Sequence, residues 1–259
     1  MPVMTTRRAI VRRGQQAPDD LAVESPLVLG LDGEAIATLM RTPGNDIELA
    51  AGWLNVESGV SAPGHIAQLR TCREDDTDRV HITLAAGVEP PRPRAFVTSA
   101  ACGVCSADVL DLAPLRRAEP HTPGFRAPAD VLVTLPDALQ ARQRAFAKTG
   151  GVHAAALAAV DGGIVCSFED VGRHNAVDKV VGRALLDGLL PATDHLLVVS
   201  GRVSFEIVQK AVAASVAGIV AVSAPSSLAV DLAREHGLLL AGMVRAGGLN
   251  VYAGAELVS

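Results

Sequence analysis

The stretch HLLVVSGRVSFEIVQKAVAASVAGIVAVS, residues 195–223, predicts the fold class of this chain. Residues 195–200 are a short, continuous apolar run typical of a buried strand, and residues 219–223 repeat that pattern. Between them, residues 204–217 have the length and apolar spacing of a helix. Strands that alternate with helices indicate a sheet covered by helices on both faces.

The same alternation extends to both sides of this stretch. Asp161-Gly162-Gly163 lies between two apolar runs and predicts a hairpin turn, so the sheet is expected to be mixed rather than wholly parallel. The further predicted strands are residues 153–160, 164–169 and 238–244. The further predicted helices are residues 136–148, 175–186 and 226–236.

The first half of the chain is richer in strand signals. Asp32-Gly33 joins apolar runs at residues 26–31 and 35–40, which predicts a hairpin. A helix is expected over residues 47–57, with Asn45 or Asp46 as its N-cap. Three more strands are expected at residues 65–72, 80–84 and 94–98.

These signals divide the chain into an arm, two domains and a linker. Residues 1–18 are predicted to be a basic, partly ordered arm, and residues 19–113 a small β-rich N-terminal domain. Residues 114–128 are rich in Pro and Arg, lack periodicity and predict a linker. Residues 129–259 form the α/β domain, so the fold class is α+β with a three-layer α/β/α second domain.

Composition excludes several classes of protein. The formal net charge of −5 argues against a general nucleic-acid binder. Four cysteines in 259 residues do not make a disulfide framework, which favours a reducing compartment. We expect no signal peptide, because no apolar segment follows the N-terminal arginines, and no membrane span, because no run of 18 apolar residues occurs.

Cys102-Gly103-Val104-Cys105 is the one close pair of cysteines. Residues 107–112 predict a short helix with Ser106 as N-cap, and its dipole would favour a thiolate at this pair. The pair alone is compatible with zinc, redox or sulfur-transfer chemistry, or with an inert pair. Zinc is disfavoured because Cys72 and Cys166 are isolated in the sequence and no His-x-Glu precedes a Pro-Cys-x-x-Cys. Thioredoxin-type redox is disfavoured because the pair follows a β-rich half rather than lying in a βαβ unit.

Polar residues gather where three predicted strands end and helices begin, at residues 169–175, 200–204 and 223–227. That edge of an α/β sheet is where ligands bind, and helix N-termini suit anions. Arg173, His174 and Arg202 would therefore converge into an anion pocket, with Arg245 as a further cation. No phosphate-binding P-loop and no dinucleotide-binding glycine pattern occurs.

Each of these polar clusters also has a purely structural interpretation. Ser204 and Ser226 would serve as N-caps, which serine commonly does. Glu169, Asp170 and Arg173 would form a surface salt-bridge group, Asp178 and Lys179 would lie on a solvated helix face, and His153 would be a core histidine. These alternatives stay open at the level of the sequence.

Several of these segments together resemble the formate dehydrogenase accessory sulfurtransferase family, FdhD. The resemblance covers most of the chain from about Glu24 onward, and the stretch EDVGRHNAVDK is far more specific than the cysteine pair. The segments that carry it are Cys102–Cys105, TGGVHAA at 149–155, EDVGRHNAVDK at 169–179, SGRVSFE at 200–206, SAPSS at 223–227 and Arg245 with Asn250-Val251-Tyr252.

The resemblance implies a sulfur carrier. In this family a cysteine desulfurase loads a persulfide on the first cysteine, here Cys102, with Cys105 assisting, and the sulfur passes to the molybdenum bis(guanine dinucleotide) cofactor required by formate dehydrogenase. The family has a cytidine-deaminase-like second domain without zinc, and its members are cytoplasmic homodimers. The resemblance thus implies no intrinsic metal, while the net charge and the lack of a long apolar run predict no nucleic-acid polymer and no membrane as partner.

The resemblance also implies where the guanine-nucleotide part is held. The implied residues are Met243, Val244, Arg245, Ala246, Gly247 and Gly248, joined by Arg173, His174, Arg202 and Ser204 from the predicted sheet edge. The family usually has Phe at the position of Met243. Two alternatives remain at this stage: a thiol-disulfide oxidoreductase, and a non-enzymatic chaperone that binds the cofactor without carrying sulfur.

Overall fold

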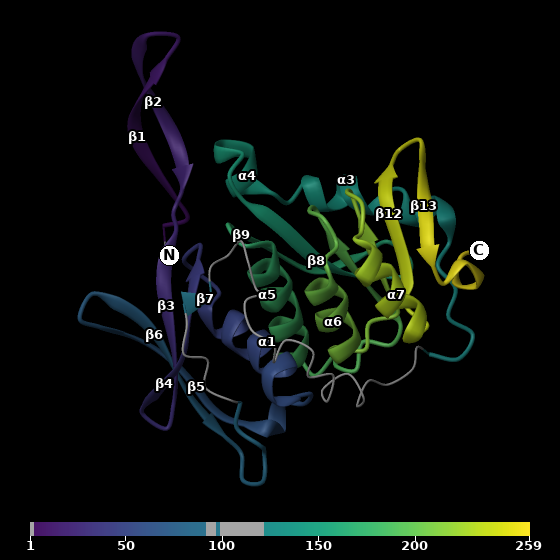
Figure 1. Ribbon diagram of the computed structural model, residues 1–259, viewed down its shortest axis with the longest axis horizontal. Helices are drawn as coiled ribbons and strands as arrows, with labels where there is room; N and C mark the ends of the chain where they lie inside the picture. The colour runs from purple at the N-terminus through teal and green to yellow at the C-terminus, as the bar shows by residue number, and fades with distance from the viewer. Residues whose placement is uncertain (1–2, 92–96, 99–121) are drawn as a thin grey trace.

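The computed structural model describes residues 3–91, 97–98 and 122–259 (Figure 1). Their strands form three sheets, of two, five and six strands. Within these ranges no helix is long and apolar enough to cross a membrane. The α+β fold class predicted from the sequence is confirmed.

The six-stranded sheet is the centre of the second half, with strand order β13-β12-β11-β10-β8-β9. Neighbours β10, β11 and β12 run parallel, while β8 is antiparallel to both β10 and β9. The sheet is therefore mixed, as predicted, and β13 is a strand that the sequence analysis did not expect. The strands are β8 (His153–Ala159), β9 (Ile164–Asp170), β10 (His195–Val199), β11 (Gly218–Ala221), β12 (Leu239–Arg245) and β13 (Gly248–Ala253).

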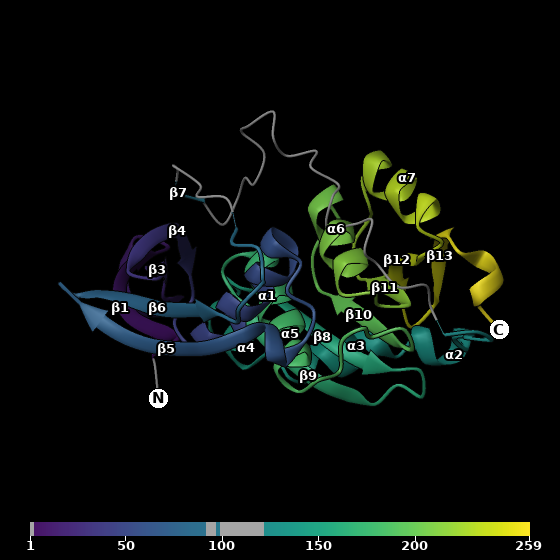
Figure 2. The same cartoon turned by 90° about the horizontal axis from the view of Figure 1, so that it is seen from below.

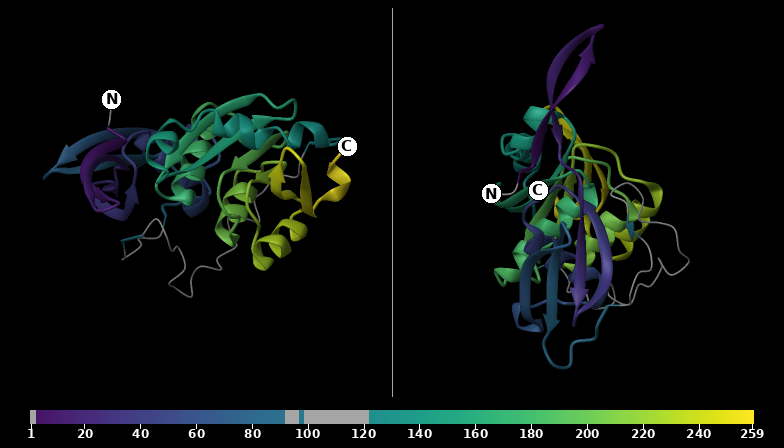
Figure 3. Two further views of the ribbon diagram at one scale, coloured as in Figure 1. Left: turned by 90° about the horizontal axis from the view of Figure 1, so that it is seen from above. Right: turned by 90° about the vertical axis from the view of Figure 1, so that its left-hand side faces the viewer.

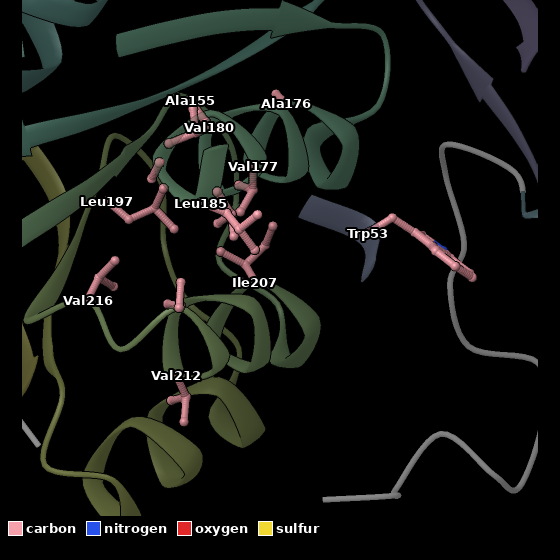
Figure 4. Packing of buried hydrophobic residues seen from close by; sticks show 14 of the residues in the cluster. Trp53, Ala155, Ala176, Val177, Val180, Leu185, Leu197, Ile207, Val212 and Val216 are labelled. Atoms are coloured by element: carbon pink, nitrogen blue, oxygen red, sulfur yellow. The ribbon is translucent and has the colours of Figure 1, made fainter. Parts of the chain in front are cut away.

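Helices cover both faces of this sheet (Figure 2). Alternate residues of β8 show why: Ala155 and Leu157 belong to one hydrophobic cluster, and Ala154 and Ala156 to another. Figure 4 shows side chains of the first cluster from the sheet, α5 and α6 pointing toward one another. The helices of that face are α1 (Asp46–Ser58), α5 (Arg173–Leu186), α6 (Phe205–Ala213) and α7 (Ser227–Glu235). The opposite face carries the short helices α2 (Ala129–Leu132) and α3 (Leu135–Gln140).

The single helix predicted at 136–148 is wrong, because the chain breaks it into α3 and α4 (Arg144–Thr149). Helix α4 begins where the carboxylate of Glu169, distant in the sequence, contacts its first turn. Glu169 accepts hydrogen bonds of 2.8 Å from the backbone N–H groups of both Ala145 and Phe146. These bonds satisfy amides that a continuous helix would have bonded internally, so a tertiary contact selects the break.

The five-stranded sheet has the order β5-β6-β3-β4-β7 and belongs to the first half of the chain. The hairpin predicted at Asp32-Gly33 is confirmed. Asp32 has φ 50° and Gly33 φ 92°, the left-handed conformations that a tight two-residue hairpin turn requires. The strands are β3 (Ser25–Leu31), β4 (Glu34–Arg41), β5 (Ile66–Glu74), β6 (Thr77–Leu84) and β7 (Val97–Thr98), with a short 3-10 turn, η1 (Pro63–His65), before β5.

Helix α1 starts at the predicted place but without the predicted side-chain cap. Asn45 is the N-cap residue, with φ 59°, and its side chain makes no capping hydrogen bond. The carboxylate of Asp46 instead accepts two hydrogen bonds of 2.9 Å from the buried guanidinium of Arg41. A buried cation needs a paired anion, so the carboxylate of Asp46, the first residue of α1, pairs with Arg41.

The N-terminal arm is more regular than predicted. Strands β1 (Thr5–Arg12) and β2 (Gln15–Ala22) form an antiparallel hairpin that projects from the rest of the molecule (Figures 1 and 3). The turn lies at Arg13-Gly14, where both residues have positive φ. Arg7 lies 3.2 Å from Asp20 across the strands. The prediction of a partly ordered arm over residues 1–18 is thus corrected, because cross-strand pairing recruits residues up to Ala22.

The two larger sheets share one hydrophobic core through the contact of α1 with α5. A Cβ added at Gly52 would lie 1.9 Å from the carbonyl oxygen of Asp178, and one at Gly182 would lie 1.8 Å from that of Glu48. Only glycine permits so close an approach of two helix backbones. The core therefore includes residues from both predicted domains, for example Leu29 and Leu197. Of the predicted linker 114–128, the structure describes residues 122–128.

Candidate functional site

The candidate site lies at one edge of the six-stranded sheet. Strands β10, β11 and β12 are parallel, and β9 runs in the same direction because both β9 and β10 are antiparallel to β8. Their carboxyl ends therefore meet at a single edge, together with the start of β8. The three polar junctions predicted from the sequence follow β9, β10 and β11, so their convergence on one edge is confirmed.

Arg173 opens α5 at this edge. Its side chain is partly buried, and its Nε atom is buried with no hydrogen-bond partner in the described part of the chain. A Cβ placed on Gly201 would lie 3.8 Å from the Cβ of Arg173 and 3.2 Å from Nδ1 of His153. The loop after β10 therefore packs against both residues. A buried donor without a partner is costly, and an anionic ligand is a suitable partner for a guanidinium.

The pKa of His153 reflects both burial of the ring and the positive charge of this region. The pKa of His153 lies below its ordinary value because the ring is partly buried and because Arg173, His174 and Arg202 add positive charge nearby. The charge of Asp170 acts in the opposite direction but is the smallest of these effects. The structure thus brings the three predicted cationic residues together around His153, which was not among the predicted site residues.

His174 is held by two residues of the next junction. Its Nε2 atom lies 2.7 Å from Oε2 of Glu206 and 3.2 Å from Oγ of Ser204. The hydrogen bond from His174 lowers the pKa of Glu206, in spite of partial burial of the carboxylate. Glu206 is a contributor that sequence reasoning missed, although it lies in the quoted SGRVSFE segment.

The two serines that were candidate N-caps differ. Ser226 caps α7, because its Oγ accepts a 3.3 Å hydrogen bond from the N–H of Ala229. Ser204 occupies the N-cap position of α6, but its side chain makes no capping bond and faces His174 instead. Ser204 therefore belongs to the candidate site, whereas the structural interpretation holds for Ser226. Arg202, two residues earlier, is exposed.

The segment Met243–Gly248 forms the end of β12 and its turn into β13. Met243 has φ 54°, and its N–H donates a 3.2 Å hydrogen bond to the carbonyl of Ser223. Val244 is buried, while Arg245, Ala246, Gly247 and Gly248 are exposed. This segment shares the edge with Arg202 but not the same cluster, because β12 lies two strands from β10, roughly 10 Å away at ordinary strand spacing. One extended ligand would be needed to contact both.

Much of the stretch 169–179 has a buried, structural function. Asp170 lies 2.7 Å from Nζ of Lys179, and both side chains are almost fully buried. Lys179 also donates a 3.0 Å hydrogen bond to the carbonyl of Thr42, while Asn175 donates one of 2.8 Å to the carbonyl of Met40. Asp178 pairs with Lys210 at 2.6 Å. The proposed surface salt-bridge group and solvated helix face are thus wrong for these residues, because α5 packs under the first half of the chain.

The predicted reactive cysteines, Cys102 and Cys105, lie outside the described residues, as does the helix predicted at 107–112. Of the described cysteines, Cys166 lies in β9, and its burial raises the pKa of the thiol to about 11. Cys166 therefore remains protonated at neutral pH, in agreement with a role as a small apolar residue. Cys72 lies in β5 with polar neighbours.

Comparisons with known proteins place this architecture in one family. The model of the FdhD/NarQ family matches residues 22–259. Curated proteins named "Sulfur carrier protein FdhD" are similar over nearly their whole length. The protein from Streptomyces coelicolor is 45% identical, with 99% of this chain and 96% of that protein covered. The one from Mycobacterium tuberculosis is 40% identical, with 93% and 92% covered.

A solved structure is similar to the fold as a whole. The crystal structure of a putative formate dehydrogenase accessory protein from Desulfotalea psychrophila superposes with a TM-score of 0.77, at 23% identity, over 98% of each chain. The family model and the curated relatives together cover nearly every residue of the chain. The chain belongs to the FdhD/NarQ family.

Proposed function

We propose that this member of the FdhD/NarQ family is a sulfur carrier that holds a persulfide on Cys102. The observation that carries the proposal is that relatives named "Sulfur carrier protein FdhD" align with 99% of a chain that itself contains the pair Cys102-Gly103-Val104-Cys105. A carrier of this kind needs a thiolate that reacts with a sulfur donor and then with an acceptor.

The loading step is a thiol exchange with no net change in oxidation state. The Cys102 thiolate attacks the terminal sulfur of a cysteine desulfurase persulfide, a new S–S bond forms at Cys102, and the desulfurase cysteine leaves as a thiolate. Delivery as sulfide requires two electrons. Cys102 and Cys105 supply them together: the Cys105 thiolate attacks Sγ of Cys102, the terminal sulfur leaves as hydrosulfide, and a Cys102–Cys105 disulfide remains.

The acceptor that we propose is the molybdenum bis(guanine dinucleotide) cofactor of formate dehydrogenase. Support comes from the cationic edge, where Arg202, a helix N-terminus and the Arg173 Nε, which has no partner among the described residues, suit phosphate oxygens. Ser204 and His174 add polar groups beside them. The turn Met243–Gly248, roughly 10 Å farther along the edge by strand spacing, would meet another part of the same long ligand.

Intact mass measurement tests the carrier. The full chain is incubated with a cysteine desulfurase and cysteine, with and without reductant, beside Cys102→Ala and Cys105→Ala. The expected result is a gain of one sulfur atom that reductant reverses and that Cys102→Ala abolishes. Loss only in Cys105→Ala would move the site to that residue. No gain in any sample, together with loss of two hydrogens on oxidation, would favour a thiol-disulfide oxidoreductase instead.

A complementation test addresses the cofactor chaperone alternative. Cells that lack the native protein are supplied with the Cys102→Ala, Cys105→Ala double variant, and formate dehydrogenase activity is measured. We expect no activity, since the sulfur-carrying thiols are absent. Full activity of the double variant would mean that the chain acts by binding the cofactor alone.

A further inference from the structure

Three side chains of types that can bind metals meet on the hairpin formed by β5 and β6, in the first half of the chain. Cys72 and Glu74 are two residues apart on β5 and so project from the same face. His81 reaches them from β6, the antiparallel neighbour. The Cys72 Sγ atom lies 3.0 Å from His81 Nε2 and 3.4 Å from Glu74 Oε1, and the latter two atoms are 3.2 Å apart.

The three donor atoms are close enough to one another to be ligands of a single metal ion. Zinc–ligand bonds of about 2.0–2.3 Å in a tetrahedron place neighbouring donor atoms roughly 3.3–3.6 Å apart. The observed separations of 3.0–3.4 Å are slightly shorter, so small side-chain rotations suffice to admit the ion. A catalytic Cys–His–Glu relay would instead use both ring nitrogens, whereas here a single nitrogen, Nε2, faces both partners.

We propose that Cys72, Glu74 and His81 bind a Zn²⁺ ion that clips β5 to β6. The thiol of Cys72 loses its proton to solvent as the Zn–S bond forms, and neither metal nor sulfur changes oxidation state. The fourth position of the tetrahedron is taken by water. The zinc charge is balanced by one thiolate and one carboxylate, so the occupied site is neutral.

The surroundings suit such a site. Nε of Arg79 lies 3.2 Å from Oε2 of Glu74, so the guanidinium charge is next to that oxygen and Oε1 remains for the metal. The side chains of His81 and Glu74 are 31% and 48% exposed, so the ion enters directly from solvent. This site goes beyond the sulfur carrier function and involves neither Cys102 nor Cys105.

The inference revises the sequence-based expectation that no intrinsic metal is bound. That expectation rested on the family resemblance, on the missing zinc signature and on the isolation of Cys72 and Cys166 along the chain. His81 is nine residues away from Cys72, and their contact exists only because the hairpin pairs β5 with β6. Cys-x-Glu with a distant His matches no familiar zinc spacing, so the sequence alone gives no signal.

Metal titration of the full chain tests the proposal. The parent carries Cys102→Ala and Cys105→Ala, so that this pair adds no thiolate. Co²⁺ is the probe because it reports thiolate ligation and tetrahedral geometry by absorption, and Zn²⁺ then competes. The expected result is one equivalent of Co²⁺ with a thiolate charge-transfer band, displaced by one equivalent of Zn²⁺.

Single substitutions identify which side chains are metal ligands. Cys72→Ser and His81→Ala should each weaken binding by more than the roughly 10- to 100-fold that loss of an outer-shell partner costs. Cys166→Ser and His65→Ala serve as matched controls and should bind as the parent does, since neither residue belongs to the cluster. Circular dichroism of the metal-free variants checks that they fold.

The opposite results would overturn the proposal. Absence of a thiolate band in the parent excludes the site, and so does a band that survives Cys72→Ser. Thermal unfolding gives a second readout: Zn²⁺ should raise the Tm of the parent and of both controls but not that of Cys72→Ser. Because the parent lacks the cysteine pair, failure here leaves the sulfur-loading experiment unaffected.

Discussion

The continuous stretch of residues 169–179 has a buried side, which is part of the packed interior, and an open side, which lines the candidate site. On the buried side Asp170, Asn175 and Lys179 hydrogen-bond to one another or to the carbonyls of residues 40 and 42. On the open side Arg173 and His174 lie in the first turn of α5 at the sheet edge, beside the loop that follows β10. Within α5 the helical repeat of 3.6 residues separates Asn175 and Lys179 from Arg173 and His174, while Asp170 ends β9.

The difference lies in how completely the polar groups are paired. Lys179 has a carboxylate and two carbonyl oxygens within hydrogen-bond distance. Arg173, in contrast, has a buried Nε atom without a hydrogen-bond partner among the described residues. Loss of one partner from a buried ion pair strongly destabilises a fold, whereas an unpaired buried donor is available to a ligand. The motif at residues 169–179 thus combines buried, paired residues with a short polar edge that is the candidate binding surface.

The largest effect is expected from breaking the buried side. Lys179→Met leaves the carboxylate of Asp170 buried without its cation, which typically costs about 3–5 kcal/mol of unfolding free energy. Denaturant unfolding followed by circular dichroism measures the loss. The double variant Asp170→Asn, Lys179→Met should recover part of it, because the uncompensated charge is gone. A loss below about 1 kcal/mol, as for an exposed ion pair, would contradict the structural role.

A smaller free-energy change, confined to binding, is expected on the open side. Arg202→Gln should leave stability within about 0.5 kcal/mol, as at most exposed positions. It should weaken binding of guanosine diphosphate roughly 10- to 100-fold, the cost of one charge-assisted hydrogen bond to phosphate. Isothermal titration calorimetry measures the affinity. Arg8→Gln, on the exposed face of β1, is the matched control and should bind as wild type. Equal affinities of both variants would argue against a phosphate contact at this edge.

The smallest effect concerns Glu206, which pairs with His174 on the open side. A carboxylate whose pKa is lowered on folding stabilises the protein above its unfolded pKa, here 4.5, and loses that contribution as the pH falls through the folded value. Glu206→Gln should therefore be less stable than wild type at neutral pH, by about 1–2 kcal/mol. The gap should close below pH 4.5.

Urea unfolding at a series of pH values measures that gap. Glu235→Gln, on the exposed end of α7, is the control and should show no gap that depends on pH in this way. A difference that stays constant from neutral to acidic pH would mean that Glu206 acts through packing rather than through its charge.

Much of the candidate site follows from strand and helix patterns alone. Parallel strands end at the same edge, so the junctions that contain Arg173, Arg202 and Ser226 were expected to converge, and they do. The spacing of the strands along that edge was not predictable, since strand order depends on which strands pair. This is why Arg245 lies apart from the other cations.

The amino-acid sequence was enough to predict local features, namely the turn at Asp32-Gly33 and the alternation of strands and helices over residues 195–223, and to identify the family. Turn chemistry and hydrophobic period act between near neighbours, so they can be read along the chain. Which polar residues are buried follows from the tertiary structure and was not predictable from the sequence. Lys179 is almost completely buried because α1 packs on α5, and Cys72 meets His81 because β5 pairs with β6. The pairing of strands and the packing of helices determine which side chains are buried and which meet, and the local sequence patterns do not encode these contacts.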